Sequence, residues 1–222
     1  MIRTRFLAPL TAFALVSAVT GCANLERSRD VSNPAVPGAV LAQQVCANCH
    51  GAGGSAASPN FPNLASQTGP YLVSQLKYFR SHDRSDPPGY EYMWGLTRSL
   101  TDSQIDGLAA YFSASPLGRQ PVEGEAGQIA AGKRVFEQGV AANDVPACAS
   151  CHGSGGLGNS IFPRLAGQHM DYLVKQLQVF QRTEQRSNPT TMPTGEIMKN
   201  VAHKLDERQI VEVAAYAQSI GN

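Results

Sequence analysis

The sequence has little charge of either sign and no block of basic residues. Its 222 residues include 18 Lys and Arg and 17 Asp and Glu, and only 16% of the residues are charged. Without Lys and Arg clustered among aromatic residues, the chain offers no electrostatic footprint for nucleic acid. It also lacks sustained alternation of apolar and polar residues, the pattern of a half-buried strand. We therefore predict an all-α protein with no nucleic-acid partner.

Long hydrophobic runs are missing as well. The most apolar segment, residues 6–19, has 14 residues, whereas a helix needs about 20 apolar residues to span a bilayer. Two arginines precede this run, so residues 1–21 are typical of a signal peptide. The run ends in Val-Thr-Gly-Cys, which resembles the lipobox of bacterial lipoproteins and implies a lipid on Cys22. The alternative is an ordinary signal peptide with an unmodified cysteine near its cleavage site.

Cysteine is scarce, and four of the five cysteines fall into two copies of one motif. The copies of Cys-x-x-Cys-His consist of Cys46, Cys49 and His50 and of Cys148, Cys151 and His152. This motif is the attachment signal for c-type haem. Its two thiols, on one turn of helix, add to the vinyl groups of the haem, and the adjacent imidazole becomes a ligand of the iron. The sequence therefore predicts two covalently bound haem c groups, with His50 and His152 as axial ligands.

Other uses of paired cysteines explain the pattern less well. A thioredoxin-like redox motif requires a βαβ context, which the sequence does not show. Four cysteines could form a tetrahedral zinc site, but about 100 residues separate the two pairs, and the histidine after each pair would be unexplained. Disulfides remain a further alternative, since an exported protein can form them.

Three blocks of sequence recur in the same order in the two halves of the chain. Residues 61–79 match residues 162–180, and residues 100–112 match residues 205–217. The offsets of these blocks are 101 and 105, against 102 for the cysteine motifs. This spacing indicates a tandem duplication of one small domain. The expected parts are a flexible tether at 22–37, domain 1 at 38–116, a linker at 117–127 and domain 2 at 128–222.

The last of the repeated blocks begins with the pattern of a helix N-terminus. Thr101 is followed three residues later by Gln104, and Asp206 is followed by Gln209 in the same way. Both pairs are predicted to be capping boxes, in which each side chain binds the other residue's backbone N–H. Domains of roughly 80 to 100 residues have small cores of their own, so a buried haem would complete each interior.

The second axial ligand of each iron decides between an electron carrier and an enzyme. Met93 and Met198 each lie seven residues before an equivalent leucine, Leu100 and Leu205, and only these two methionines occupy equivalent positions. Methionine also fills gaps in hydrophobic cores, but equivalence in both halves favours axial ligation of the iron. Met192 is the second candidate for the haem of domain 2.

The chain resembles the dihaem cytochromes of the cytochrome c4 family, which contain two class I cytochrome c domains in tandem. The resemblance covers almost everything from about residue 38 onward. It is carried by the paired haem motifs, the two Phe-Pro-x-Leu-Ala-x-Gln segments, the Met-to-Leu spacing and the Ala-Ala-Tyr ends of the final helices. It implies His/Met ligation at both haems. It also implies that the carbonyls of Pro62 and Pro163 accept a hydrogen bond from the ligand imidazoles.

Several other side chains carry secondary expectations. Arg80 and Arg182 end matching helices and either pair with haem propionates or face solvent, and Trp94 is expected to pack on the first haem. The remaining histidines, His82, His169 and His203, are expected to have surface or local hydrogen-bonding roles.

The predicted ligands indicate an electron carrier without a small-molecule substrate, because an iron with six ligands has no open position. The resemblance implies electron transfer in the bacterial periplasm, from a quinol-oxidising complex or dehydrogenase to a terminal oxidase. A lipid on Cys22 would attach the protein to a membrane, and the absence of Asp after this cysteine favours the outer one. The alternatives are a dihaem peroxidase or thiosulfate dehydrogenase, and a cytochrome subunit fixed in a larger dehydrogenase or oxidase complex.

Overall fold

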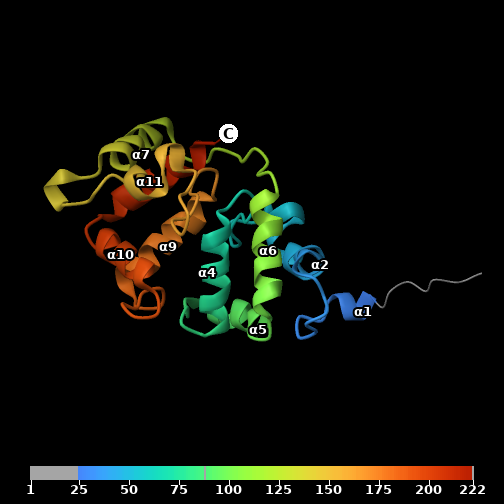
Figure 1. Cartoon of the computed structure of the whole chain (residues 1–222). Helices are drawn as coiled ribbons and strands as arrows, with labels where there is room; N and C mark the ends of the chain where they lie inside the picture. Colours follow the sequence, from blue (N-terminus) through green and yellow to red (C-terminus); the bar gives the residue numbers. More distant parts are fainter. Residues whose placement is uncertain (1–24, 88, 222) are drawn as a thin grey trace, which may run out of the picture.

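The structure, a computed structural model, describes residues 25–87 and 89–221 and consists of helices joined by turns and loops (Figure 1). Over these residues there is no β-sheet, only three isolated bridges, so the all-α prediction is confirmed. No helix within the described residues is long and apolar enough to cross a membrane. The predicted signal peptide and Cys22 lie outside the described residues.

The first half of the chain forms one helical domain, drawn from blue to green in Figure 1. Its elements are α1 (Leu25–Ser28), α2 (Gly38–Leu41), η1 (Ala42–Cys46), α3 (Ala47–His50), η2 (Ala52–Gly54), α4 (Gly69–Arg80), η3 (Gly89–Met93), α5 (Trp94–Thr97) and α6 (Asp102–Ala114). Buried apolar side chains of α2, α4 and α6 form its core, which includes Leu41, Leu72, Ile105 and Phe112.

The second half repeats this arrangement, drawn from yellow to red in Figure 1. Its elements are α7 (Ala126–Gln138), η4 (Ala141–Asn143), α8 (Ala149–His152), η5 (Ser154–Gly156), α9 (Met170–Arg182), α10 (Pro193–Ala202) and α11 (Glu207–Ser219). The core lies mainly between α7 and α11, where the rings of Phe136 and Tyr216 lie 5.4 Å apart.

The predicted capping boxes are present at the starts of α6 and α11. The side chain of Thr101 accepts a hydrogen bond from the backbone N–H of Gln104, and Asp206 accepts one from Gln209. In both pairs the glutamine side chain accepts a hydrogen bond from the backbone N–H of the capping residue. These contacts satisfy N–H groups that a helix start otherwise leaves without partners.

The second half of the segment predicted as a tether packs on domain 1. Val36 is buried in the domain 1 core, and Val31 packs against it. The side-chain amide of Gln104 donates hydrogen bonds to the carbonyls of Asn33 and Val36, both at 3.0 Å. Isolated valines in a polar, Pro-containing segment show no helical periodicity, so the sequence pattern did not reveal this packing.

Helix α7 begins at Ala126 and includes the last two residues of the segment predicted as a linker. Glu125 and Gln128 form a capping box that starts this helix. The linker is held at both ends. The N–H of Leu117 donates to the Ser66 hydroxyl at 3.1 Å, and the N–H of Glu123 donates to the Gln218 side chain at 3.2 Å.

A close crossing between the first and last helices organises each domain. In domain 2, a Cβ atom added to Gly132 of α7 would lie 1.8 Å from the carbonyl oxygen of Glu212 in α11. In domain 1, a Cβ on Gly38 would lie 2.4 Å from the carbonyl oxygen of Gln104. Only a residue without a side chain allows the backbones to approach this closely.

We expect Gly132→Ala to lower the free energy of unfolding of domain 2 by about 1–3 kcal/mol or more, because the added methyl group forces α7 and α11 apart. Gly127→Ala is the matched control in the same helix, since nothing lies within 4 Å of its added Cβ. That variant should be neutral or stabilised by up to about 1 kcal/mol. Denaturant unfolding of the haem-loaded protein measures both effects, and equal stability of the two variants would contradict the prediction.

Candidate functional site

Each cysteine motif lies on a short helix that ends immediately after its histidine. In domain 1, Cys46 is the last residue of η1, and Cys49 and His50 belong to α3. In domain 2, Cys148 precedes α8, which contains Cys151 and His152. The next residue in each half is a glycine with positive φ, 76° and 81°, which turns the chain away. Both thiols and the imidazole of a motif are therefore held on one helical turn.

The four described cysteines form no disulfide with one another. Burial raises the pKa of the unmodified Cys46 and Cys148 thiols to about 11. Among the described residues, no group of three or more His, Cys, Asp and Glu side chains gathers into a metal site. The four-cysteine zinc site considered from the sequence is therefore not formed.

Both motif histidines are buried and fixed in one orientation. His50 and His152 are 8% and 5% exposed. The Nδ1 atom of each ring lies 2.9 Å from a carbonyl oxygen, that of Pro62 for His50 and that of Pro163 for His152. Because a carbonyl can only accept, Nδ1 carries the proton and Nε2 keeps its lone pair. Burial lowers the pKa of both rings, which keeps them neutral and able to bind a metal.

One continuous, mainly apolar cavity runs through both domains and is bordered by both cysteine motifs. Three methionines line it: Met93 from domain 1 and Met192 and Met198 from domain 2. Each half thus offers two thiols, a neutral imidazole and at least one thioether to an apolar space. This donor set fits a covalently bound haem in each domain.

The methionines differ in how the fold presents them. Met93 ends the π-helical turn η3, and its carbonyl accepts a hydrogen bond from Thr97 at 2.7 Å. Met198 lies within α10 and is partly buried, whereas Met192 precedes α10 and is only 3% exposed. Domain 2 therefore holds two thioethers at the cavity, and domain 1 holds one among the described residues.

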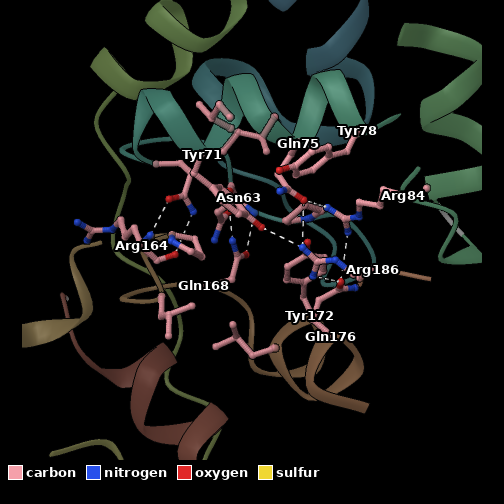
Figure 2. Close-up of a pocket in the computed structure, with 18 of the residues that line it drawn as sticks. Asn63, Tyr71, Gln75, Tyr78, Arg84, Arg164, Gln168, Tyr172, Gln176 and Arg186 are labelled. Atoms are coloured by element: carbon pink, nitrogen blue, oxygen red, sulfur yellow. Dashed lines mark hydrogen bonds between the residues drawn. The ribbon is translucent and has the colours of Figure 1, made fainter. Parts of the chain in front are cut away.

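A buried group of charged and polar side chains lines the cavity at the domain interface (Figure 2). Arg84 and Arg186 occupy equivalent positions in the repeat and are 5% and 7% exposed. Arg84 forms an ion pair with Asp86 at 2.7 Å. Arg186 donates across the interface to the Tyr71 hydroxyl at 3.2 Å and to the Gln75 side chain at 3.1 Å. Two buried cations thus share one buried carboxylate, which leaves one excess positive charge beside the cavity.

The pKa of Asp86 reflects this excess of positive charge. Burial by itself would raise the pKa of the carboxyl group. The Arg84 guanidinium, which also donates to the carboxylate, and the charge of Arg186 outweigh burial and lower the pKa of Asp86 to about 2. The net effect of the same ion pair is to raise the pKa of Arg84 above its usual value. The carboxylate is therefore ionised at any physiological pH.

Three side chains singled out in the sequence are not at the cavity. Arg80 pairs with Asp102 at 2.7 Å, and Arg182 pairs with Glu207 at 2.5 Å, so both arginines bind the first turn of a final helix. Trp94 stacks on His82 at 5.0 Å between ring centroids instead of lining the cavity. The partners of these three side chains are therefore other side chains of the protein.

Of the remaining histidines, His82 and His203 make local contacts, whereas His169 contacts the other domain. His82 stacks on Tyr90 as well, with ring centroids 4.9 Å apart. His169 is buried, and its Nε2 lies 3.0 Å from the carbonyl oxygen of Ala56 in the other domain. His203 directly follows α10, and its backbone N–H donates to the carbonyl of Lys199.

Comparison with known proteins identifies the fold and the family. The family model of cytochrome c matches residues 35–115 and again residues 129–221. Cytochrome c4 of Azotobacter vinelandii is 34% identical over 185 residues, which cover 79% of this chain and 84% of that protein. This chain belongs to the cytochrome c4 family.

Two further relatives extend the comparison of this cytochrome. The solved structure of cytochrome c4 from Acidithiobacillus ferrooxidans aligns with a TM-score of 0.70 at 37% identity, over 78% of this chain and 98% of that one. A thiosulfate dehydrogenase electron acceptor from Stutzerimonas stutzeri (strain A1501) is 32% identical over 193 residues, 83% of this chain and 82% of that protein. The predicted tandem of cytochrome c domains and the two covalently bound haem c groups are thereby confirmed.

Sequence reasoning missed the interface residues of this cytochrome. Arg84 and Arg186 lie in the repeated segments Arg-Ser-Asp-Pro and Arg-Ser-Asn-Pro, whose offset of 102 equals that of the cysteine motifs. This repetition was a usable signal. Their burial was not predictable, because arginine is seldom buried unless it has partners, and these partners come from distant parts of the chain.

Because the pKa of Asp86 is about 2 in the folded protein, against 3.8 as its ordinary value, its carboxylate contributes stability at neutral pH. This contribution is fully present above pH 4 and is lost as the pH falls towards 2, and it amounts to about 2 kcal/mol. We expect Asp86→Asn to lower the free energy of unfolding at pH 7 by about this amount and to remove this part of the acid sensitivity.

Denaturant unfolding at several pH values between 2 and 7, followed by circular dichroism, measures the effect. Asp102→Asn is the control, because this carboxylate is exposed and pairs with Arg80 at the surface, where such pairs contribute at most about 1 kcal/mol. Parallel pH profiles for the wild-type protein and Asp86→Asn would contradict the prediction.

Proposed function

We propose that this dihaem cytochrome carries single electrons in a bacterial periplasm, from a quinol-oxidising complex or dehydrogenase to a terminal oxidase. The axial ligands in this proposal are His50 and Met93 in domain 1 and His152 and Met198 in domain 2. The observation that carries it is the duplicated donor set at one continuous cavity, with each imidazole oriented by a backbone carbonyl and kept neutral by burial. The signal-peptide-like N-terminus supports export.

The side chains of this protein hold each site in a form suited to electron transfer. Bound haem supplies one-electron exchange between Fe(III) and Fe(II). The proline carbonyls fix the imidazole orientation, and a methionine thioether, a soft ligand, favours the reduced state. The cavity lining is mainly apolar, and the buried Arg84 and Arg186 would offer positive charge to haem propionates. Because both sites adjoin the same cavity, an electron can enter through one domain and leave through the other.

A second candidate donor is a thiosulfate dehydrogenase. The relative from Stutzerimonas stutzeri is named as the electron acceptor of such an enzyme, and it aligns over most of this chain. In that case this cytochrome would accept electrons from thiosulfate oxidation and would itself perform no chemistry on the substrate. Stopped-flow reduction of the oxidised cytochrome by a purified thiosulfate dehydrogenase, with and without thiosulfate, tests this candidate.

The predicted ligation is tested by carbon monoxide binding to the dithionite-reduced holoprotein. The wild-type spectrum should not change, because both irons are fully ligated. In Met198→Ala, about half of the haem should bind carbon monoxide, and Met93→Ala should open the other half. Met192→Ala is the control in domain 2 and should remain closed. Carbon monoxide binding by Met192→Ala but not by Met198→Ala would make Met192 the ligand. Carbon monoxide binding by the wild-type protein would favour the enzyme alternative.

Membrane attachment is tested by Cys22→Ser in the full-length precursor, because the lipid in this proposal is bonded to that thiol. The wild-type protein should fractionate with membranes and require detergent for release, and the variant should be released without detergent. Separation of the two membranes on a density gradient then shows whether the anchor lies in the outer one, as we propose. A wild-type protein that is released by salt alone would argue against lipidation.

A further inference from the structure

Gln67 and Gln168, the last residues of the two Phe-Pro-x-Leu-Ala-x-Gln segments, each reach into the opposite domain. Both side chains are buried, and both lie near the proline that binds a ligand histidine. Gln168 of domain 2 is shown in Figure 2 with its amide directed at Asn63 of domain 1. Neither the haem motifs nor the axial methionines explain why these glutamines occur at equivalent positions.

The two glutamines make equivalent pairs of hydrogen bonds, Gln168 to domain 1 and Gln67 to domain 2. Gln168 Oε1 accepts from the backbone N–H of Asn63 at 2.8 Å, and its Nε2 donates to the Asn63 carbonyl at 2.9 Å. Gln67 Oε1 accepts from the N–H of Arg164 at 2.6 Å, and its Nε2 donates to the Arg164 carbonyl at 3.0 Å. Each side-chain amide thus pairs with both backbone groups of one residue across the interface.

The residue bound in each case directly follows the proline that holds a ligand histidine. The N–H of Asn63 and the carbonyl of Pro62 belong to one peptide group. That carbonyl accepts the Nδ1–H of His50, so one amide connects Gln168 to the imidazole. The same relation connects Gln67, through the peptide group between Pro163 and Arg164, to His152.

We propose that Gln168 and Gln67 are positioning residues that set the ligand strength of the histidine in the opposite domain. An amide whose N–H donates to an acceptor is polarised, and its carbonyl becomes a stronger acceptor, by about 10–30% per bond. A stronger hydrogen bond at Nδ1 makes the imidazole a more basic ligand. A more basic ligand stabilises Fe(III), so each glutamine lowers the reduction potential of the haem in the other domain.

The inference rests on the proposed axial role of the two histidines and adds a connection between the domains. The side chain of each glutamine contacts the other domain, so its hydrogen bonds to that domain exist only while the domains are docked. Its Oε1 also accepts the N–H of the following residue in its own chain segment, which fixes the side chain. Docking of the domains and the potentials of both haems are therefore linked.

The test replaces one glutamine and measures the potential of each haem separately. In Gln168→Leu, the haem bound to Cys46 and Cys49 should become easier to reduce, with about a threefold larger reduction equilibrium constant. Since tenfold corresponds to 59 mV for one electron, this is about 28 mV. The haem of domain 2 should not change. Gln67→Leu should give the reciprocal result, and Gln168→Met serves if the leucine variant does not fold.

Spectroelectrochemistry of the holoprotein gives the two potentials, and nuclear magnetic resonance of the reduced protein assigns them through contacts of each haem with assigned residues. The same spectra report the Nδ1–H of His50, whose resonance should move towards that of a weaker hydrogen bond in Gln168→Leu. Thr68→Val is the matched control. It removes another hydrogen bond across the interface, from Thr68 Oγ1 to the Ser160 carbonyl at 2.6 Å, and should shift neither potential.

Three results would overturn the inference. They are a changed reduction potential of the haem in the substituted domain, an equal change at both haems, and a matching change in Thr68→Val. Each of these results would mean that the glutamines merely hold the domains together. An unchanged Nδ1–H resonance of His50 in Gln168→Leu would overturn it as well. Failure of the axial assignment is separate, because it would appear in the wild-type protein as ring signals of His50 and His152 without the shifts of iron ligands.

Discussion

The hydrogen bond from the imidazole of each Cys-x-x-Cys-His motif to a proline carbonyl is the contact on which the site depends. It selects the tautomer, leaves Nε2 free and holds the ring at a fixed angle to the helical turn that carries the cysteines. Phe61 and Phe162 contact the two rings edge-on, with centroids 6.0 and 6.4 Å away, and restrict them further. Without this contact the cysteines could still attach a cofactor, but the imidazole would have neither a fixed tautomer nor a fixed direction.

The interface between the domains does more than join two equal halves. It buries two arginines and one aspartate beside the shared cavity, and the side chains that surround them come from α4 of one domain and α9 of the other. Asn188 replaces, in domain 2, the aspartate found at position 86 of domain 1. The duplicated fold is therefore nearly symmetric in shape and asymmetric in charge, and this asymmetry gives the two sites different electrostatic surroundings.

The sequence allowed prediction of those features whose chemistry depends on short spacing. The haem motifs, the capping boxes and the tandem repeat are local patterns, and the structure or the family comparison supports each of them. Contacts between distant segments were not predictable in this way. Nothing local in the sequence indicated the burial of Arg84 and Arg186 or the ion pairs of Arg80 and Arg182, and the valines at 31 and 36 carried too little periodicity to indicate their packing.

The packing of residues 31–37 on domain 1 also limits how far the protein can move if Cys22 carries a lipid. Only the nine residues 22–30 would then separate the anchor from the folded body. Even fully extended, such a segment spans about 30 Å. With so short a connecting segment, the haem sites would remain close to the bilayer surface. There, collisions with membrane-bound redox complexes occur in two dimensions instead of three. A partner that diffuses freely would have to come to the cytochrome.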